Sequence, residues 1–200
     1  MQTSAYLFAE HPAWSVFFWT SYASFFFVSS WVHRRDAKGQ RGENRDRGSK
    51  IVIYVFSMGG SLAAFVIPAF HPELRILLPH EALFFGAMAV FWAGLLLYVW
   101  AVRTLGEFFR TSVTLLDGQK LVTRGPYRLL RHPAYTGGIL LFSGAGLATG
   151  NWASAAVAAG AVAAGYIWRI RVEERALLER FGAAFEARRR QTWAVIPLLW

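Results

Sequence analysis

The chain has 200 residues, of which 55% are apolar and only 16% are charged, so an ordinary water-soluble domain is excluded and lipid is the expected solvent. The formal net charge of +9 would point to nucleic acid in a soluble protein, but here the Lys and Arg residues lie between apolar stretches, and membrane topology explains that distribution without nucleic acid. Cysteine is absent, which excludes disulfides, thiolate metal sites and thiol nucleophiles.

Three apolar stretches without a formal charge come first along the chain, at residues 13–32, 51–70 and 83–102. Each has about twenty residues, and a helix of that length, rising ~1.5 Å per residue, can cross a hydrocarbon core of ~30 Å. We therefore predict a transmembrane helix at each of them.

A fourth charge-free stretch, 139–168, is too long for one upright helix, and Gly150-Asn151 interrupts it near its middle. We predict a helical hairpin here. Gly146 and Gly150 at GxxxG spacing, together with the Ala-rich run 155–165, would allow two backbones to pack closely in lipid. The alternative is one long tilted helix.

The basic residues indicate the orientation. All but one of the 21 Lys and Arg residues lie in segments 33–50, 103–138 and 169–200, and the exception is Arg75. The predicted spans place these three segments on one side, which is the cytoplasmic side by the positive-inside rule. The predicted fold is therefore an all-α polytopic membrane protein with about five transmembrane helices and its N-terminus outside. The Ala- and Arg-rich composition suggests a prokaryotic source, hence the bacterial inner (cell) membrane with the active site facing the cytoplasm.

Two loops are predicted to carry no chemistry. The loop 33–50 is Gly-rich and highly charged, so we predict a solvated or headgroup-facing connector without an active site. His71 and His80 lie in the short external loop without a third ligand, so no metal site is predicted.

The segment 103–138 is too polar to cross lipid. It is predicted to contain a short extended piece at 121–123, flanked by turns at Asp117-Gly118 and Gly125-Pro126. Its backbone, if drawn against the membrane surface, needs hydrogen-bond partners, some of which a bound polar ligand could supply.

The helix after the hairpin continues into the cytoplasm. Arg169 and Glu173 stand four residues apart on one face, and Gly182 is a natural stop. Spacing alone favours an ordinary i,i+4 pair between Arg169 and Glu173.

The C-terminal half also carries an ordered set of motifs: Gly125-Pro126-Tyr127, then Arg131-His132-Pro133-Ala134-Tyr135-x-Gly137, a helical hairpin, and Glu173-Glu174. This order resembles the isoprenylcysteine carboxyl methyltransferase family, whose pattern is RHPxY followed at a distance by EE. Phe181-Gly182 and the terminal residues 196–200 also look like that family's C-terminus. The resemblance covers roughly 103–200, predicted to be the cofactor-binding and catalytic half with the hairpin 139–168, while 1–102 form a scaffold within one membrane domain, 1–200.

The resemblance implies S-adenosylmethionine as cofactor, bound between the segment before the hairpin and the helix after it. The residues at the matching motif positions are Gln119, Lys120, Leu121, Val122, Tyr127, His132, Pro133, Ala134, Tyr135 and Glu173. Without the resemblance, His132 would only cap the hairpin, and Tyr127 and Tyr135 would be interfacial aromatics.

The resemblance also implies a substrate that arrives from the bilayer. Arg169 falls on the family's substrate-binding arginine, whose planar fork could hold a carboxylate, and Arg169 and Glu174 are the predicted catalytic residues. Thr114 stands where the family often carries an amide side chain, so its role is left open. We assign Arg124 and the run 188–190 to topology or to lipid headgroups.

The leading hypothesis is an S-adenosylmethionine-dependent membrane methyltransferase that O-methylates the carboxylate of a prenylcysteine-like or other lipophilic substrate. Its expected partners are that substrate and membrane lipids, with no nucleic acid, and the expected state is a monomer. The alternatives are phospholipid N- or small-thiol S-methylation with the same cofactor, a membrane NADPH-dependent reductase of the sterol type, and a scaffold or small transporter. Every Lys, Arg, Asp and Glu lies outside the predicted spans, which argues against a transport pathway.

Overall fold

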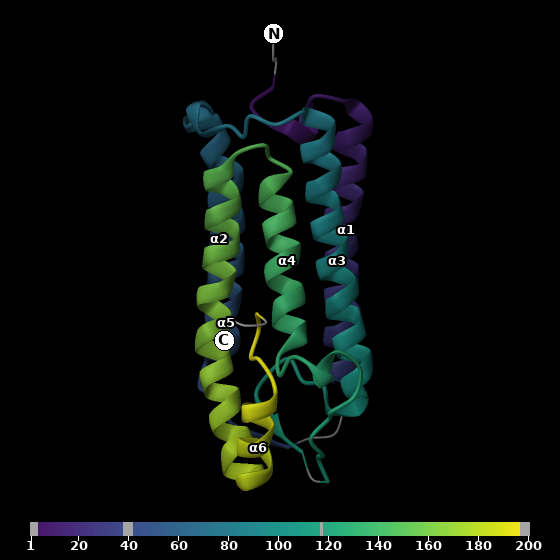
Figure 1. Cartoon of the computed structure of the whole chain (residues 1–200), viewed down its shortest axis with the longest axis vertical. Coiled ribbons are helices and arrows are strands. Elements are labelled where there is room, and N and C mark those ends of the chain that lie inside the picture. The colour runs from purple at the N-terminus through teal and green to yellow at the C-terminus, as the bar shows by residue number, and fades with distance from the viewer. Residues whose placement is uncertain (1–3, 38–41, 117, 197–200) are drawn as a thin grey trace.

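The computed structural model describes residues 4–37, 42–116 and 118–196, and in this part the chain is a bundle of upright helices with a short helix at one end (Figure 1). The α-helices are α1 (Pro12–Ala37), α2 (Ser49–Phe70), α3 (His80–Leu105), α4 (Pro133–Leu147), α5 (Trp152–Phe181) and α6 (Ala183–Gln191). Short 3-10 helices lie at η1 (Leu7–Ala9), η2 (Pro72–Leu74), η3 (Gly106–Phe108) and η4 (Gly125–Arg128), and two short strands at β1 (Glu43–Asn44) and β2 (Thr114–Leu115).

The predicted all-α membrane fold is confirmed. Among the described helices, α2, α3 and α5 are long and apolar enough to cross a membrane. The helix α4 has 15 residues, and at ~1.5 Å per residue it is shorter than a hydrocarbon core of ~30 Å. A count of five spans therefore stays a prediction, although a helix covers each predicted stretch.

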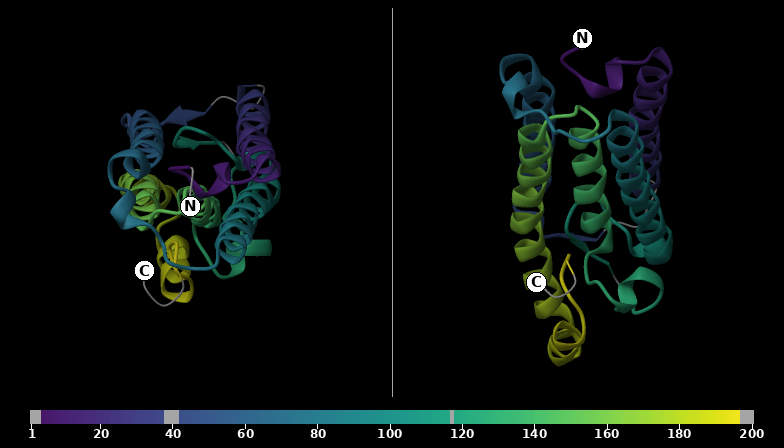
Figure 2. Two further views of the ribbon diagram at one scale, coloured as in Figure 1. Left: turned by 90° about the horizontal axis from the view of Figure 1, so that it is seen from above. Right: turned by 45° about the horizontal axis from the view of Figure 1, so that its top comes forward.

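The helix α4 has α3 on one side and α5 on the other, while α2 packs along α5 and α1 lies beside α3 (Figures 1 and 2). Phe84, Phe91 and Leu141 are fully buried in the main core, between α3 and α4. Aromatic contacts attach α1 to this core, since the Trp14 ring stacks on Phe84 with centroids 4.7 Å apart.

The close approach of α3 and α4 depends on glycine. A Cβ added at Gly94 of α3 would lie 2.6 Å from the carbonyl oxygen of Gly137, and one added at Gly144 of α4 would lie 2.7 Å from that of Ala87. Neither position leaves room for a methyl group, so backbone lies directly against backbone, as small residues allow in lipid. This packing places the start of α4 beside the lower end of α3.

The helical hairpin is confirmed, and a single long helix is wrong. Asn151 ends the turn as the N-cap of α5, where its side-chain oxygen accepts hydrogen bonds from the amides of Ala153 (2.9 Å) and Ser154 (3.2 Å). Gly146 packs against Ala155 as expected, since an added Cβ would lie 2.7 Å from its Cα. Gly150 has a different role, because its φ of 80° belongs to the turn.

The described parts of the three basic segments meet at the same end of the bundle, opposite the end that carries Arg75 (Figure 1). The strands β1 and β2 join two of them, with Glu43 opposite Leu115 and Asn44 opposite Thr114. The extended piece expected at 121–123 is not a strand; the ladder lies at β2 instead, where the loop after α1 supplies a partner. Of the predicted turn, Asp117 lies outside the described residues, as do residues 197–200 of the C-terminal motif.

The packing of α3 on α4 is testable with alanine. Gly94→Ala should lower the free energy of unfolding by about 1–3 kcal/mol, because the added methyl group overlaps α4 backbone. Gly86→Ala on the same helix is the control: its Cβ meets nothing within 4 Å, and alanine gains up to about 1 kcal/mol in a helix. Thermal unfolding in detergent measures both, and equal melting temperatures for the two variants would contradict the contact.

The orientation is testable by cysteine labelling, because the chain has no cysteine of its own. In intact cells, Leu77→Cys should react with a membrane-impermeant maleimide and Thr123→Cys should not, since both positions are exposed and the segments that contain them, 71–79 and 118–124, lie at opposite ends of the bundle (Figure 1). Lysed cells should label both. Labelling of both in intact cells, or the reverse pattern, would refute the predicted topology.

Candidate functional site

A cavity of about 260 Å³ opens at the end of the bundle where the basic segments meet. Its walls come from the end of α1, α2, α3, the polar segment that follows α3, the start of α4, the lower half of α5 and α6. Most of the wall is apolar, with Ile53, Tyr98, Phe109 and Leu177 among its residues. Polar side chains from several elements complete the wall, and an apolar wall with polar groups is the usual construction of a small-molecule site.

The cavity brings together ten of the twelve site residues expected from the sequence. They are Gln119, Lys120, Leu121, Val122, Tyr127, His132, Ala134, Tyr135, Arg169 and Glu173. Pro133 is not among the described wall residues. It is fully buried at the first position of α4, where the backbone N–H that proline lacks would have no partner within the helix. Glu174 is not part of that wall either.

The chain segment after α6 holds the RHPxY motif in place. The amides of Arg131 and His132 donate to the carbonyl oxygens of Trp193 (2.8 Å) and Ala194 (3.0 Å), and the Trp193 amide donates to Leu129 (3.1 Å). His132 is then the N-cap of α4, with its ring 4% exposed. The C-terminal segment therefore sets the position of the motif, although the two are about sixty residues apart in sequence.

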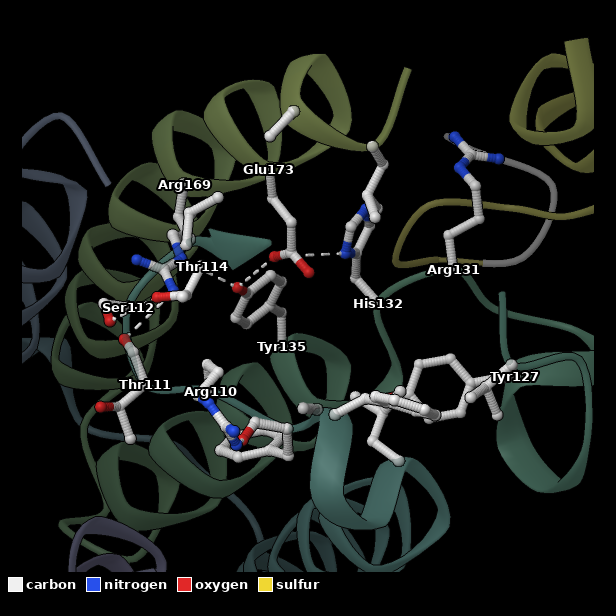
Figure 3. Close-up of a pocket in the computed structure, with 18 of the residues that line it drawn as sticks. Arg110, Thr111, Ser112, Thr114, Tyr127, Arg131, His132, Tyr135, Arg169 and Glu173 are labelled. Carbon is white, nitrogen blue, oxygen red and sulfur yellow. Dashed lines mark hydrogen bonds and ion pairs between the residues drawn. The ribbon is translucent and has the colours of Figure 1, made fainter. Parts of the chain in front are cut away.

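A chain of polar contacts crosses the wall from α5 to α4 (Figure 3). The Arg169 Nε donates to the Tyr135 hydroxyl at 3.2 Å, and that hydroxyl donates to Glu173 Oε2 at 2.6 Å. His132 Nδ1 lies 3.8 Å from the same carboxylate oxygen. Arg169 and Glu173 thus interact through Tyr135, rather than as the direct i,i+4 pair that their spacing favours.

Glu174, expected from the sequence to be catalytic, is surrounded by three basic side chains. Its Oε1 accepts from Arg131 Nε at 2.7 Å and lies 3.2 Å from His132 Nε2, while its Oε2 lies 3.5 Å from Arg189 Nε. Glu174 lies one residue further round α5 than Glu173, and it is not among the described wall residues. These contacts hold Glu174 beside His132, and a catalytic role for Glu174 stays a prediction.

Arg169 is 3% exposed, and its fork is engaged by the protein itself. Nη1 pairs with Asp46 and donates to Ser49 Oγ at 2.8 Å, and Nη2 donates to the Thr111 carbonyl oxygen at 3.1 Å. A substrate carboxylate therefore does not find a free two-pronged guanidinium here. In the described structure, the fork binds a carboxylate of the chain.

The segment 33–50, predicted to be a connector without an active site, contributes residues at both of its ends to the candidate cavity. His33 and Lys50 line the cavity, and Asp46 is the ion-pair partner of Arg169. Burial acts to raise the pKa of Asp46, but hydrogen bonds from the Lys50 and Val113 amides outweigh it, with help from the Arg169 charge, and hold that pKa below its ordinary value. No short motif surrounds Asp46, so only its long-range contacts distinguish it from the other charges in the loop.

A second residue missed by the sequence analysis is Arg188 of α6. It lines the cavity and donates from Nη2 to the carbonyl oxygen of Tyr127, so it ties α6 to η4. A run of three arginines near a membrane surface gives no signal that separates one from its neighbours.

Backbone donors are also available at the cavity. In the described part of the chain, no backbone hydrogen bond uses the amides of Lys120, Leu121 and Val122, all of which line the wall. Lys120 is exposed and Leu121 and Val122 are half-buried, so these amides can donate to water or to a polar ligand in the cavity. The site thus combines free amide donors, a carboxylate at Glu173 and an extended apolar wall.

Comparison with known proteins agrees with this arrangement. The chain is 29% identical over 109 residues to the protein-S-isoprenylcysteine O-methyltransferase of Schizosaccharomyces pombe, which covers 48% of this chain and 46% of that protein. It is 34% identical over 50 residues to the uncharacterized protein YpbQ of Bacillus subtilis, covering 25% of this chain and 30% of that protein. The solved structure of the eukaryotic intramembrane Ras methyltransferase ICMT (isoprenylcysteine carboxyl methyltransferase) superposes with a TM-score of 0.58 at 25% identity.

That structural match covers 72% of this chain and 52% of the solved chain, so the chain spans about half of the length of these methyltransferases. The phospholipid methyltransferase family matches residues 82–184, which include α4, α5 and most of the cavity wall. Because this match extends over more than half of the sequence and contains the RHPxY and EE motifs in order, the chain belongs to the phospholipid methyltransferase family.

Proposed function

We propose that this chain is an S-adenosylmethionine-dependent membrane methyltransferase, with the carboxylate of a prenylcysteine-like or other lipophilic compound as its acceptor. The observation that carries the proposal is the single cavity that gathers His132, Tyr135, Glu173 and the free amides of 120–122 at the end of an apolar bundle. The two relatives with an assigned activity are both methyltransferases, which favours this chemistry over a reductase or a transporter.

The residues present fit such a methyl donor. The Glu173 carboxylate can accept from an ammonium group or a ribose hydroxyl, and the amides of Lys120 and Leu121 can donate to a carboxylate. Tyr98 and Tyr127 offer aromatic faces in the same wall, which suit a purine or a sulfonium. When bound, S-adenosylmethionine would supply a methyl group on a positively charged sulfur.

The apolar part of the wall suits a lipophilic acceptor. Ile53 and Tyr54 of α2 lie on the cavity wall, and Tyr54 is 69% exposed on a helix apolar enough to lie in lipid. An acceptor chain can therefore approach from the bilayer without crossing the basic segments.

A carboxylate acceptor needs no general base, because it is already ionised at neutral pH. What the protein must do is align the acceptor and exclude water, since both charges disappear in the transfer and a dry cavity favours that loss. Arg169 contributes a fixed positive charge at the α5 wall, and at most one of its N–H groups remains for the acceptor after its contacts with Asp46, Ser49, Thr111 and Tyr135.

We also propose the bacterial inner membrane as the location, with the cavity facing the cytoplasm. The gathering of the described basic residues at the cavity end of the bundle supports that orientation.

The cofactor side of the cavity is tested with His132→Ala and Glu173→Gln. Each should weaken S-adenosylmethionine binding by about 1–3 kcal/mol, because each leaves a buried polar partner unpaired. Titration calorimetry on the purified protein measures the affinity. Glu179→Gln, on an exposed face of the same helix, is the control and should bind like the unmodified chain. Unchanged affinity in both site variants would place the cofactor elsewhere.

The acceptor side is tested with Arg169→Lys. Lysine keeps the charge but cannot reproduce the planar fork that contacts Asp46, Thr111 and Tyr135. Methyl transfer to an artificial prenylcysteine acid should fall at least about tenfold, which is ~1.4 kcal/mol, with little change in cofactor affinity. Full activity would remove Arg169 from the site, and equal losses in turnover and cofactor affinity would move it to the cofactor side.

A further inference from the structure

Asp46 lies between α1 and α2, outside residues 82–184 that match the family. Its carboxylate is held by its own surroundings: it accepts from Ser49 Oγ at 3.0 Å, from the Lys50 amide at 3.1 Å and from the Val113 amide at 3.1 Å. These donors come from the start of α2 and from the segment leading into β2. The carboxylate therefore has a fixed position before Arg169 is considered.

This fixed carboxylate faces the guanidinium of Arg169, which is equally restrained. Arg169 Nη1 pairs with Asp46, and the Arg169 Nε at the other edge of the fork donates to the Tyr135 hydroxyl at 3.2 Å. Both residues are nearly buried, at 9% and 3% exposure. A planar guanidinium held at two edges cannot turn about its long side chain. The hydrogen bonds continue from Arg169 to Glu173, because the Tyr135 hydroxyl donates to Glu173 Oε2.

We propose that Asp46 is a positioning residue of the active site, whose ionised carboxylate fixes the Arg169 guanidinium, and through it Tyr135, at the acceptor side of the cavity. The inference rests on the proposed methyl transfer. It brings the first half of the chain into the catalytic arrangement. It also predicts that the loop after α1 affects turnover without touching the cofactor.

Two other roles for Asp46 make different predictions. The first is capping of α2 through Ser49 and Lys50, and asparagine caps a helix about as well as aspartate. The second is a stand-in for the acceptor carboxylate, which a substrate would have to displace from Arg169. Asp46→Asn separates all three, because it keeps the size and one acceptor oxygen but removes the charge that Arg169 requires.

The experiment measures kcat and KM for an artificial prenylcysteine acid and the dissociation constant of S-adenosylmethionine. Asp46→Asn should lower kcat at least tenfold and leave the cofactor dissociation constant within twofold. Glu43→Gln is the matched control, since this exposed carboxylate of the same loop pairs with Arg45 and is not among the described wall residues. It should leave both quantities unchanged. In an Arg169→Lys background, Asp46→Asn should cause little further loss, because the contact is already broken.

Unchanged kcat in Asp46→Asn would overturn the inference and leave only the capping role, while faster turnover or a lower acceptor KM would show a stand-in carboxylate instead.

A measurement without acceptor keeps the inference separate from the proposed function. Nitrogen-15 NMR of arginine side chains in detergent should show a slowly exchanging Nε–H that Arg169→Lys removes. Asp46→Asn should speed its exchange at least tenfold and Glu43→Gln should not. If the unmodified protein transfers no methyl group, the proposed function fails, and unchanged exchange in Asp46→Asn would overturn the positioning role by itself.

Discussion

The structure around the cavity depends on one constraint, which is that the buried guanidinium of Arg169 must be fully paired. An unpaired charge in such a place costs several kcal/mol, whereas a well-paired one can be retained. Asp46, Thr111 and Tyr135 meet this need from three different parts of the chain. By pairing Arg169 they also bring the loop after α1, the segment before β2 and the start of α4 to one face of α5.

The position of the cavity also depends on α4, which is short and packs closely against α3 and α5. Glycines at Gly94, Gly137 and Gly144 let the α3 and α4 backbones touch, and the capped turn at Asn151 returns the chain along α5. Because α4 begins only at Pro133, the polar segment before it lies at the end of the bundle, where water and lipid headgroups meet. His132 thus faces a cavity that a full-length span would have closed.

These two features divide the cavity by chemistry. The side formed by α4, α5 and the free amides is polar and suits a charged methyl donor, whereas α2 and α3 contribute mainly apolar and aromatic side chains. Placing an ionic reaction beside an apolar wall removes water from the reacting groups, and the lower dielectric strengthens their electrostatic interactions with every fixed charge nearby. Glu174 and the segment after α6 support the polar side from outside the cavity, and both contact Arg131 at its wall.

The sequence by itself determined the positions of helices α1 to α5, the hairpin at Gly150-Asn151, the stop at Gly182 and ten residues of the cavity wall, because hydropathy, turn chemistry and the RHPxY and EE motifs are local signals, but it did not predict α6. It did not reveal the contacts of Asp46 and Arg188, nor that Glu173 is among the described wall residues while Glu174 is not. Those depend on which segments meet in space: Asp46 is 123 residues from Arg169. A buried charge selects its partner by geometry after folding, and no periodicity in the chain records that choice.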